Sequence, residues 1–252
     1  MTALSLATMR KVFDRVELVT DSKGAELLKD LNYHEVHLDL DHLSDLHPRY
    51  WSAGKVYALK RYSVPFVHVD GDVFFLKPEI KSLFQENWDA VVQMKETGAH
   101  YSKTYSHLID WMEPALFGWN LKMYNFAYNC GVMGFRDMDF KDHFTDEYFR
   151  ALRACQSKQN VIDGIGSEYE INIVLEQSLL THLALDCNVH VKEIIPIKRQ
   201  TFPGLQPEAE KLGFVHLWGP SKYEDEWQRR IEKRLAEIDP KTHRKLFPLS
   251  HL

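Results

Sequence analysis

The sequence has few cysteines, and it has no long apolar run and no long basic run. Its three cysteines, Cys130, Cys155 and Cys187, are far apart and odd in number. They form neither a metal-ligand spacing nor a disulfide framework, which favours a reducing compartment. No uninterrupted apolar stretch approaches the ~20 residues of a membrane-spanning helix. A net charge of -5 without a run of Lys and Arg argues against a general nucleic-acid binder.

The N-terminal stretch "MTALSLATMRKVF" is a poor secretory leader, because its positive charges follow its short apolar run instead of preceding it. This pattern, together with the sparse cysteines, favours a cytoplasmic protein without a transmembrane segment. The 252 residues contain no internal repeat, no low-complexity segment and no linker. The sequence therefore predicts one domain over residues 1–252, which is long enough to bury a sizeable core.

Apolar periodicity predicts that helices and strands alternate along much of the chain. Helices are expected at residues 3–13, 22–32, 50–62, 140–156, 169–186 and 221–238, and strands at residues 15–21, 35–40, 64–70, 88–94, 128–135, 189–197 and 213–219. The early order of helix, strand, helix, strand, helix, strand is typical of an α/β protein with parallel strands. We expect a mixed, mostly parallel central sheet flanked by helices.

Two carboxylates interrupt an apolar segment at the end of the third predicted strand. In "PFVHVDGDVFFLKP", residues 65–78, Asp70 and Asp72 flank Gly71, and apolar residues lie on both sides of them. Ligands of open α/β sheets collect at the carboxyl ends of strands, and a cation between two carboxylates offsets their repulsion. The pattern favours a Mn²⁺ or Mg²⁺ site shared with substrate phosphates. The alternative is a solvated surface turn, since Asp-Gly is common in turns.

A second polar constellation, "HLWGPSK" at residues 216–222, follows the last predicted strand. His216 ends that strand, Gly219 makes a turn with the following proline, and Lys222 opens the final helix. Imidazole is a common ligand of transition metals, and a Lys in the first turn of a helix suits a diphosphate. The alternatives are a histidine at the edge of the core and a solvated lysine.

Four segments, taken in order, resemble glycosyltransferase family 8 of the GT-A glycosyltransferases, the glycogenin and galactosyltransferase type. They are "HVDGDVFF" with its D-x-D motif, "YNCGVMGF", "LEQSLL", and "HLWGPSK" with an H-x-x-G-x-x-K closing motif. The resemblance covers about residues 16–225. It implies a single Rossmann-like GT-A domain that transfers a sugar from a nucleotide-sugar donor, a UDP-sugar by expectation, with retention of configuration.

The resemblance implies a role for each matching residue of the two polar constellations. Asp70 and Asp72 would bind Mn²⁺, or Mg²⁺, bridging the donor diphosphate, and His216 would complete the protein ligands of the metal. Lys222 would hold the phosphate, and Gly219 would belong to the same donor-binding turn. A departing nucleoside diphosphate develops negative charge, which a cation and a lysine stabilise.

Further site residues are expected in the middle of the chain. Asn129 would line the sugar pocket, and Glu176 or Gln177 would lie by the anomeric carbon; the alternatives are a strand-end hydrogen bond for Asn129 and a helix-surface carboxylate for Glu176. Lys55 would reach the donor. Asp21 would approach the nucleotide or, equally, cap the next helix. The acceptor, a glycan, lipid or protein, would meet the aromatic stretch at residues 101–128.

The sequence departs from the family pattern at both ends of the resemblance. Its first convincing strand is "VELVTD", with no earlier strand to recognise the base, and Tyr223 and Glu224 follow the closing motif where Pro-Trp is frequent. One rival function is therefore a catalytically weak or inactive binding protein of the same fold. Another is a nucleotidyltransferase, which would also use a carboxylate pair; it usually needs a Gly-rich loop bearing Lys or Arg, and none is found here.

Overall fold

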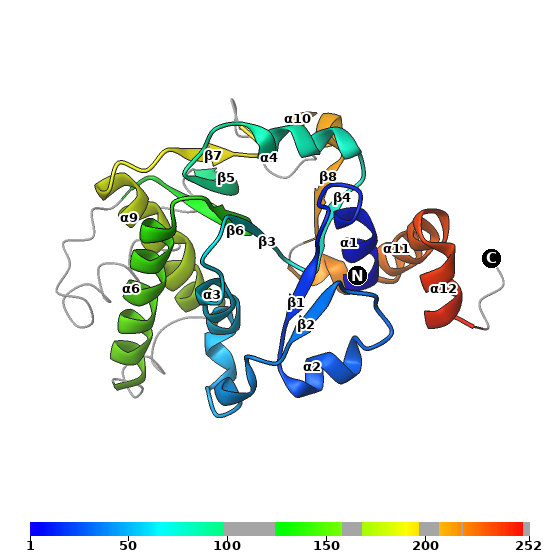
Figure 1. The fold of residues 1–252 in the computed structure, drawn as a ribbon, viewed down its shortest axis with the longest axis horizontal. Helices are drawn as coiled ribbons and strands as arrows, with labels where there is room; N and C mark the ends of the chain where they lie inside the picture. Colours follow the sequence, from blue (N-terminus) through cyan, green and yellow to red (C-terminus); the bar gives the residue numbers. More distant parts are fainter. Residues whose placement is uncertain (98–123, 158–167, 197–206, 218, 249–252) are drawn as a thin grey trace. The chain divides into compact units, whose positions relative to one another are not determined.

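The computed structural model describes residues 1–97, 124–157, 168–196, 207–217 and 219–248 (Figure 1). The chain forms two compact units, each assembled from segments that are distant in the sequence. Unit 1 comprises Met1–Asp41, Val69–Glu86 and Pro203–Leu252, and unit 2 comprises His42–His68 and Asn87–Phe202. The single domain expected for residues 1–252 stays a prediction. Most of the aromatic stretch at residues 101–128, expected to meet the acceptor, lies outside the described residues.

Unit 1 combines two small sheets with six helices among the residues described. Its helices are α1 (Thr2–Met9), α2 (Ser22–Leu27), α4 (Lys81–Gln85), α10 (Pro207–Leu212), α11 (Asp225–Ile238) and α12 (Pro240–Leu246). Strands β1 (Glu17–Val19) and β2 (Glu35–His37) form a parallel pair, and β4 (Val73–Phe75) pairs with β8 (Phe214–His216) in antiparallel orientation. A 3₁₀ turn at Pro220–Tyr223 precedes α11.

The core of unit 1 forms where α1 and α11 pack near β4. Helix α11 is strongly charged, but Ile231 and Leu235 are four residues apart and therefore lie on one helical face. That face packs with Leu4 and Ala7 of α1 and with Phe74 of β4 in a single buried cluster. Burial of these side chains fixes the strand that follows Asp70 and Asp72 against the rest of the unit.

Unit 2 contains a four-stranded sheet in the order β3-β6-β5-β7. Its strands are β3 (Phe66–Val69, whose last residue belongs to unit 1), β5 (Ala90–Thr97), β6 (Phe126–Phe135) and β7 (Val191–Glu193). Strand β5 is antiparallel to β6 and parallel to β7, and the sheet as a whole is mostly antiparallel. The α/β class is confirmed, but the predicted mostly parallel order is wrong for this sheet. The strand β6 is buried on both faces, and such an apolar run carries no information about strand direction.

The helices of unit 2 are α3 (Ser52–Lys60), α6 (Met138–Ser157), α8 (Glu168–Ile173) and α9 (Leu179–Asp186), with a π-helical turn at Val174–Ser178. Figure 1 shows α6 and α9 gathered beside β6. Their apolar faces form one large core with the sheet and with α3. A buried polar network also crosses this core: the Ser52 hydroxyl is 2.7 Å from the Tyr148 hydroxyl and donates to Asn172 Oδ1 at 2.8 Å. No helix in the described residues is long and apolar enough to cross a membrane.

The burial of the cysteines gives a direct test of this packing. Cys130 and Cys155 are buried and Cys187 is exposed, and burial raises the pKa of the Cys155 thiol to about 12. Because the thiolate is the reactive form, we expect one fast-reacting thiol per native chain at neutral pH, and all three after unfolding in guanidinium chloride. Titration with a chromogenic disulfide reagent measures both numbers.

The substitution Cys187→Ser provides the control, because it removes only the exposed thiol. We expect it to abolish the fast reaction of the native chain. Rapid labelling of a second cysteine in the native protein would contradict the packing of β6 and α6 described above.

Candidate metal and phosphate site

The pairing of β4 with β8 joins the two polar constellations of the sequence. In this antiparallel pair Val73 lies opposite His216, and the Leu217 amide donates to the Asp72 carbonyl at 3.0 Å. The residue before β4 is therefore held beside the residue that ends β8. Backbone hydrogen bonds, rather than side-chain attraction alone, position the carboxylate and the imidazole.

The side chains of this cluster lie within ligand distance of one another. Nε2 of His216 is 3.3 Å from Oδ1 of Asp72, and Nζ of Lys222 donates to Oδ2 of the same carboxylate at 2.9 Å. Asp70, Asp72 and His216 each offer a ligand atom, and these three atoms all lie within 4.8 Å of one another. All three residues are half-buried. The predicted metal and phosphate residues of unit 1 are thus brought together.

The turn between β3 and β4 is shaped by helix α1. The Val73 amide donates to the Asp70 carbonyl at 3.1 Å, which closes the Asp-Gly-Asp turn. The Ser5 hydroxyl donates to the same carbonyl at 3.4 Å, and a Cβ on Gly71 would lie 3.2 Å from Thr2 Oγ1. Gly71 therefore allows the helix to approach the turn closely. The interpretation of this segment as a fully solvated surface turn does not fit these contacts.

The charge state of Asp72 follows from its two partners. Burial of the side chain acts to raise the pKa of Asp72, but hydrogen bonds and charge from His216 and Lys222 outweigh it and hold the pKa below its ordinary value. The carboxylate is therefore ionised at neutral pH. The ionised carboxylate and the imidazole can bind a cation, and the neighbouring ammonium group can contact an anion.

Gly219 sets the direction of the chain between β8 and the turn that carries Lys222. Its φ of 69° lies in the left-handed region, which favours glycine, and the position of a Cβ there would meet nothing within 4 Å. Backbone conformation, not lack of space, is thus the reason for a glycine. The donor contact predicted for Gly219 stays a prediction.

Two residues predicted near the sugar form a buried ion pair in unit 2. Nζ of Lys55 lies 2.9 Å from Oε1 of Glu176 and also donates to the Cys130 carbonyl at 3.1 Å. The two side chains are only 10% and 3% exposed, so the helix-surface interpretation of Glu176 is wrong. Glu176 and Gln177 lie on the π-helical turn at Val174–Ser178, and such turns are frequent at functional sites.

The other predicted residues have defined local partners. Asn129 donates from Nδ2 to Glu96 Oε1 at 2.7 Å and accepts from the Gly131 amide at 2.9 Å, so the alternative of a side-chain to backbone bond is met, although within β6 and not at its end. Oε1 of Gln177 is buried and has no hydrogen-bond partner in the part of the chain that the structure describes. Asp21 caps α2, where its Oδ1 accepts from the Gly24 amide at 2.6 Å. The capping alternative for Asp21 is thereby confirmed.

Sequence reasoning did not single out one further cluster of ligating side chains, formed by Glu17, Glu35 and His37 on β1 and β2. A signal was present: in "EVHLDL" the glutamate and the histidine are two positions apart, and in a strand this spacing puts both on one face. Only the pairing with β1, however, adds Glu17 to them.

The structure thus defines a mixed α/β protein with a half-buried cluster of two aspartates, a histidine and a lysine in unit 1. The chain belongs to the family described as "Family of unknown function (DUF6734)", whose profile matches residues 1–249. No curated protein and no solved structure matches the chain.

The buried Lys55–Glu176 pair generates a stability prediction. The substitution Lys55→Met leaves the Glu176 carboxylate buried without its cation, and we expect it to lower the free energy of unfolding by about 3–5 kcal/mol. The double variant Lys55→Met/Glu176→Gln should lose less than the sum of the single losses, because the two groups interact directly. Urea unfolding curves at 25 °C measure all three values.

Lys60 offers a matched control in the same helix, since it pairs with Asp146 at the surface with side chains 39% and 68% exposed. The substitution Lys60→Met should change the free energy of unfolding by no more than about 1 kcal/mol. Equal losses for Lys55→Met and Lys60→Met would mean that the buried ion pair does not form.

Proposed function

We propose that this chain is a metal-dependent glycosyltransferase of the GT-A type that uses a nucleotide-sugar donor, a UDP-sugar by preference. The observation that carries the proposal is the gathering of Asp70, Asp72, His216 and Lys222 by the β4–β8 pairing. Two carboxylates, an imidazole and an ammonium group in one half-buried cluster suit a divalent cation together with a diphosphate. Retention of configuration, a glycan, lipid or protein acceptor and a cytoplasmic location belong to the same proposal and rest on the family resemblance or composition.

The donor set fits the proposed cation. Carboxylate oxygens and a neutral imidazole nitrogen are ligands that Mn²⁺ accepts readily, and Mg²⁺ accepts the oxygens. Oδ1 of Asp72 faces His216, whereas Oδ2 is held by Lys222. When bound, the cation would act as a Lewis acid that offsets the charge of the departing diphosphate.

Lys222 would contribute a second positive charge from the chain itself. Its ammonium group is fixed 2.9 Å from Asp72 and remains partly accessible, with a side chain 23% exposed. A phosphate oxygen placed beside it would gain a charge-assisted hydrogen bond without a large rearrangement of the lysine. The sugar-pocket roles of Asn129, Glu176 and Gln177 remain predictions from the resemblance.

One observation favours the rival function, a nucleotide- or sugar-binding protein without turnover. Glu176 is buried, and its carboxylate is paired with Lys55. A carboxylate committed to a structural ion pair is poorly suited to stabilise a developing positive charge on a sugar. The rival shares the metal and diphosphate chemistry of unit 1 and differs only in the absence of bond cleavage.

Ligand-dependent unfolding temperatures test the donor chemistry common to both functions. UDP, GDP, CDP and ATP are each added with and without Mn²⁺, and we expect one nucleoside diphosphate to raise the Tm only in the presence of the metal. A ligand at 100 times its Kd adds about 2.7 kcal/mol of stability, which corresponds to a rise of roughly 5–10 °C for a chain of this size. The substitution Asp72→Asn should remove the metal-dependent part of the shift.

The matched control is Asp14→Asn, the same substitution in unit 1 at a side chain that is 96% exposed and pairs with Lys81. It should keep the full response. If none of the four nucleotides stabilises the protein in a metal-dependent way, the proposed donor chemistry is wrong. Hydrolysis of a panel of UDP-sugars then separates the two functions: cleavage that Asp72→Asn abolishes supports the transferase, and binding without cleavage supports the rival.

A further inference from the structure

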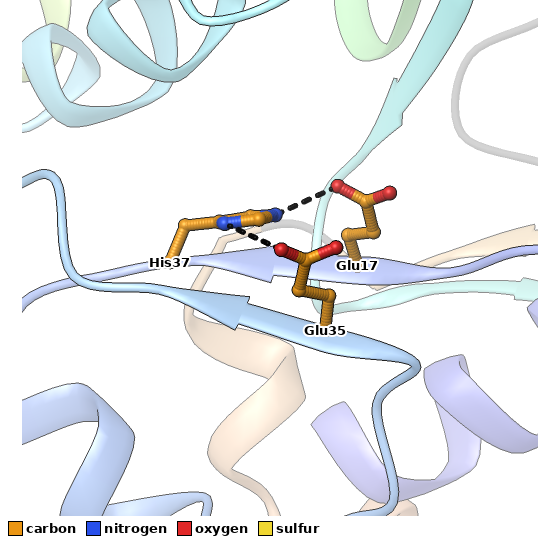
Figure 2. Close-up of side chains that lie close together, drawn as sticks. All are labelled: Glu17, Glu35 and His37. Atoms are coloured by element: carbon orange, nitrogen blue, oxygen red, sulfur yellow. Dashed lines mark hydrogen bonds and ion pairs between the residues drawn. The ribbon is translucent and has the colours of Figure 1, made fainter.

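Glu17, Glu35 and His37 form a second group of ligating side chains in unit 1, separate from Asp70, Asp72 and His216 (Figure 2). In the parallel pair of β1 and β2, Glu17 lies opposite Glu35. His37 is two positions after Glu35, so all three side chains lie on one face of the pair. One ligand atom from each residue lies within 4.8 Å of the other two.

In Figure 2, dashed lines join the two ring nitrogens of His37 to the carboxylates of Glu17 and Glu35. Its Nε2 is 2.8 Å from Oε2 of Glu17, whereas its Nδ1 faces Oε1 of Glu35 at 3.6 Å. The second distance is beyond hydrogen-bonding range, and Nδ1 has no other hydrogen bond within the described residues. The His37 side chain is only 8% exposed. The imidazole is thus largely buried, and its Nδ1 lies near the Glu35 carboxylate without a hydrogen bond to it.

A neutral imidazole carries one N–H group and therefore cannot donate to both carboxylates. If Nε2 donates to Glu17, Nδ1 carries a lone pair 3.6 Å from the Glu35 oxygen, so two acceptors lie close together. A cation between them removes the repulsion. Two metal–ligand bonds of about 2.1 Å that meet at a tetrahedral angle span about 3.4 Å, close to the 3.6 Å between Nδ1 and Oε1.

Arg15 holds the carboxylates of both glutamates of the cluster. Its guanidinium group forms ion pairs with Oε1 of Glu17 and Oε2 of Glu35, which leaves the other oxygen of each carboxylate directed at His37. Hydrogen bonds to ligating carboxylates are typical of the surroundings of protein metal sites. The single positive charge of the guanidinium faces two carboxylates, and this balance again favours a cation.

We propose that this cluster binds one divalent transition-metal ion, with Zn²⁺ preferred over Mn²⁺ and Mg²⁺. Nδ1 of His37 and the carboxylate of Glu35 are the ligands, and Glu17 fixes the tautomer and orientation of the imidazole through Nε2. This is the carboxylate–histidine–metal arrangement common to zinc sites.

The Glu35 side chain is 48% exposed, so water can complete the coordination. The order of affinities follows the general preference of nitrogen and oxygen sites for Zn²⁺ over Mn²⁺. The site is independent of the proposed transferase function.

Zinc binding is measured on tag-free, full-length protein after treatment with a chelator. All proteins carry Cys187→Ser to remove the exposed thiol, and Asp70→Asn/Asp72→Asn to silence the other cluster. Competition with a chromogenic chelator should show one Zn²⁺ bound per chain. We expect His37→Ala and Glu35→Gln to weaken binding at least 100-fold, and Glu17→Gln to weaken it about 10–100-fold, as for residues that orient a ligand. Co²⁺ provides a second probe, because its visible absorption band reports the loss of a nitrogen ligand.

Glu26→Gln is the matched control, because Glu26 is an exposed glutamate of unit 1 that pairs with Lys29 at the surface. It should leave the zinc affinity unchanged. Glu35→Gln keeps the test informative if His37→Ala does not fold, since Glu35 is half exposed. Equal zinc affinity in Glu35→Gln and in Glu26→Gln would overturn the proposal, and so would the absence of bound zinc when Glu17, Glu35 and His37 are all unchanged; the cluster would then be an ion-pair network only.

Discussion

The candidate site depends on three backbone pairs between two short strands. Strand β4 follows Asp72 directly and β8 ends at His216, so their antiparallel register places these two side chains beside each other. Neither strand is long enough to be stable alone, and both rely on the apolar cluster that α1 and α11 form around Phe74. The hydrophobic packing of unit 1 thus controls the distance between a carboxylate and an imidazole that are far apart in the sequence. The backbone pairing positions Asp72 and His216, and Lys222 then binds the Asp72 carboxylate through its ammonium group.

The two units use charged residues in opposite ways. In unit 1, Asp72 is half-buried and shares its two oxygens between His216 and Lys222, and neither partner removes it fully from solvent. In unit 2, Lys55 and Glu176 neutralise each other inside an apolar core. A partly exposed, charge-rich cluster can exchange its partners for a ligand at low cost, whereas a buried ion pair resists exchange because each charge would lose a close partner of opposite sign.

The sequence indicated most strands and the two polar constellations, because both are local patterns. Apolar runs bounded by turn residues predicted every described strand except β4, and the family resemblance implied that Asp70, Asp72, His216 and Lys222 share one site. Strand direction was not readable, since β6 is apolar on both faces and its connection to β5 is long. The burial of Glu176 and the cluster around His37 also depend on contacts between segments that are distant in the chain. A local sequence pattern does not show which distant segments will be in contact in the folded chain.

The π-helical turn at Val174–Ser178 makes the fold sensitive to the deletion of a residue from this turn. A π turn contains one residue more than the α-helical turn it replaces, so the loss of one residue between 174 and 178 would restore a regular helix. Each residue of an α-helix turns the chain by about 100°. The helical segment on one side of the deletion would therefore rotate relative to the other, and either α8 or the face that carries Leu179 and Leu183 would leave its place in the core. Related chains should accept substitutions in this stretch far more readily than a change in its number of residues.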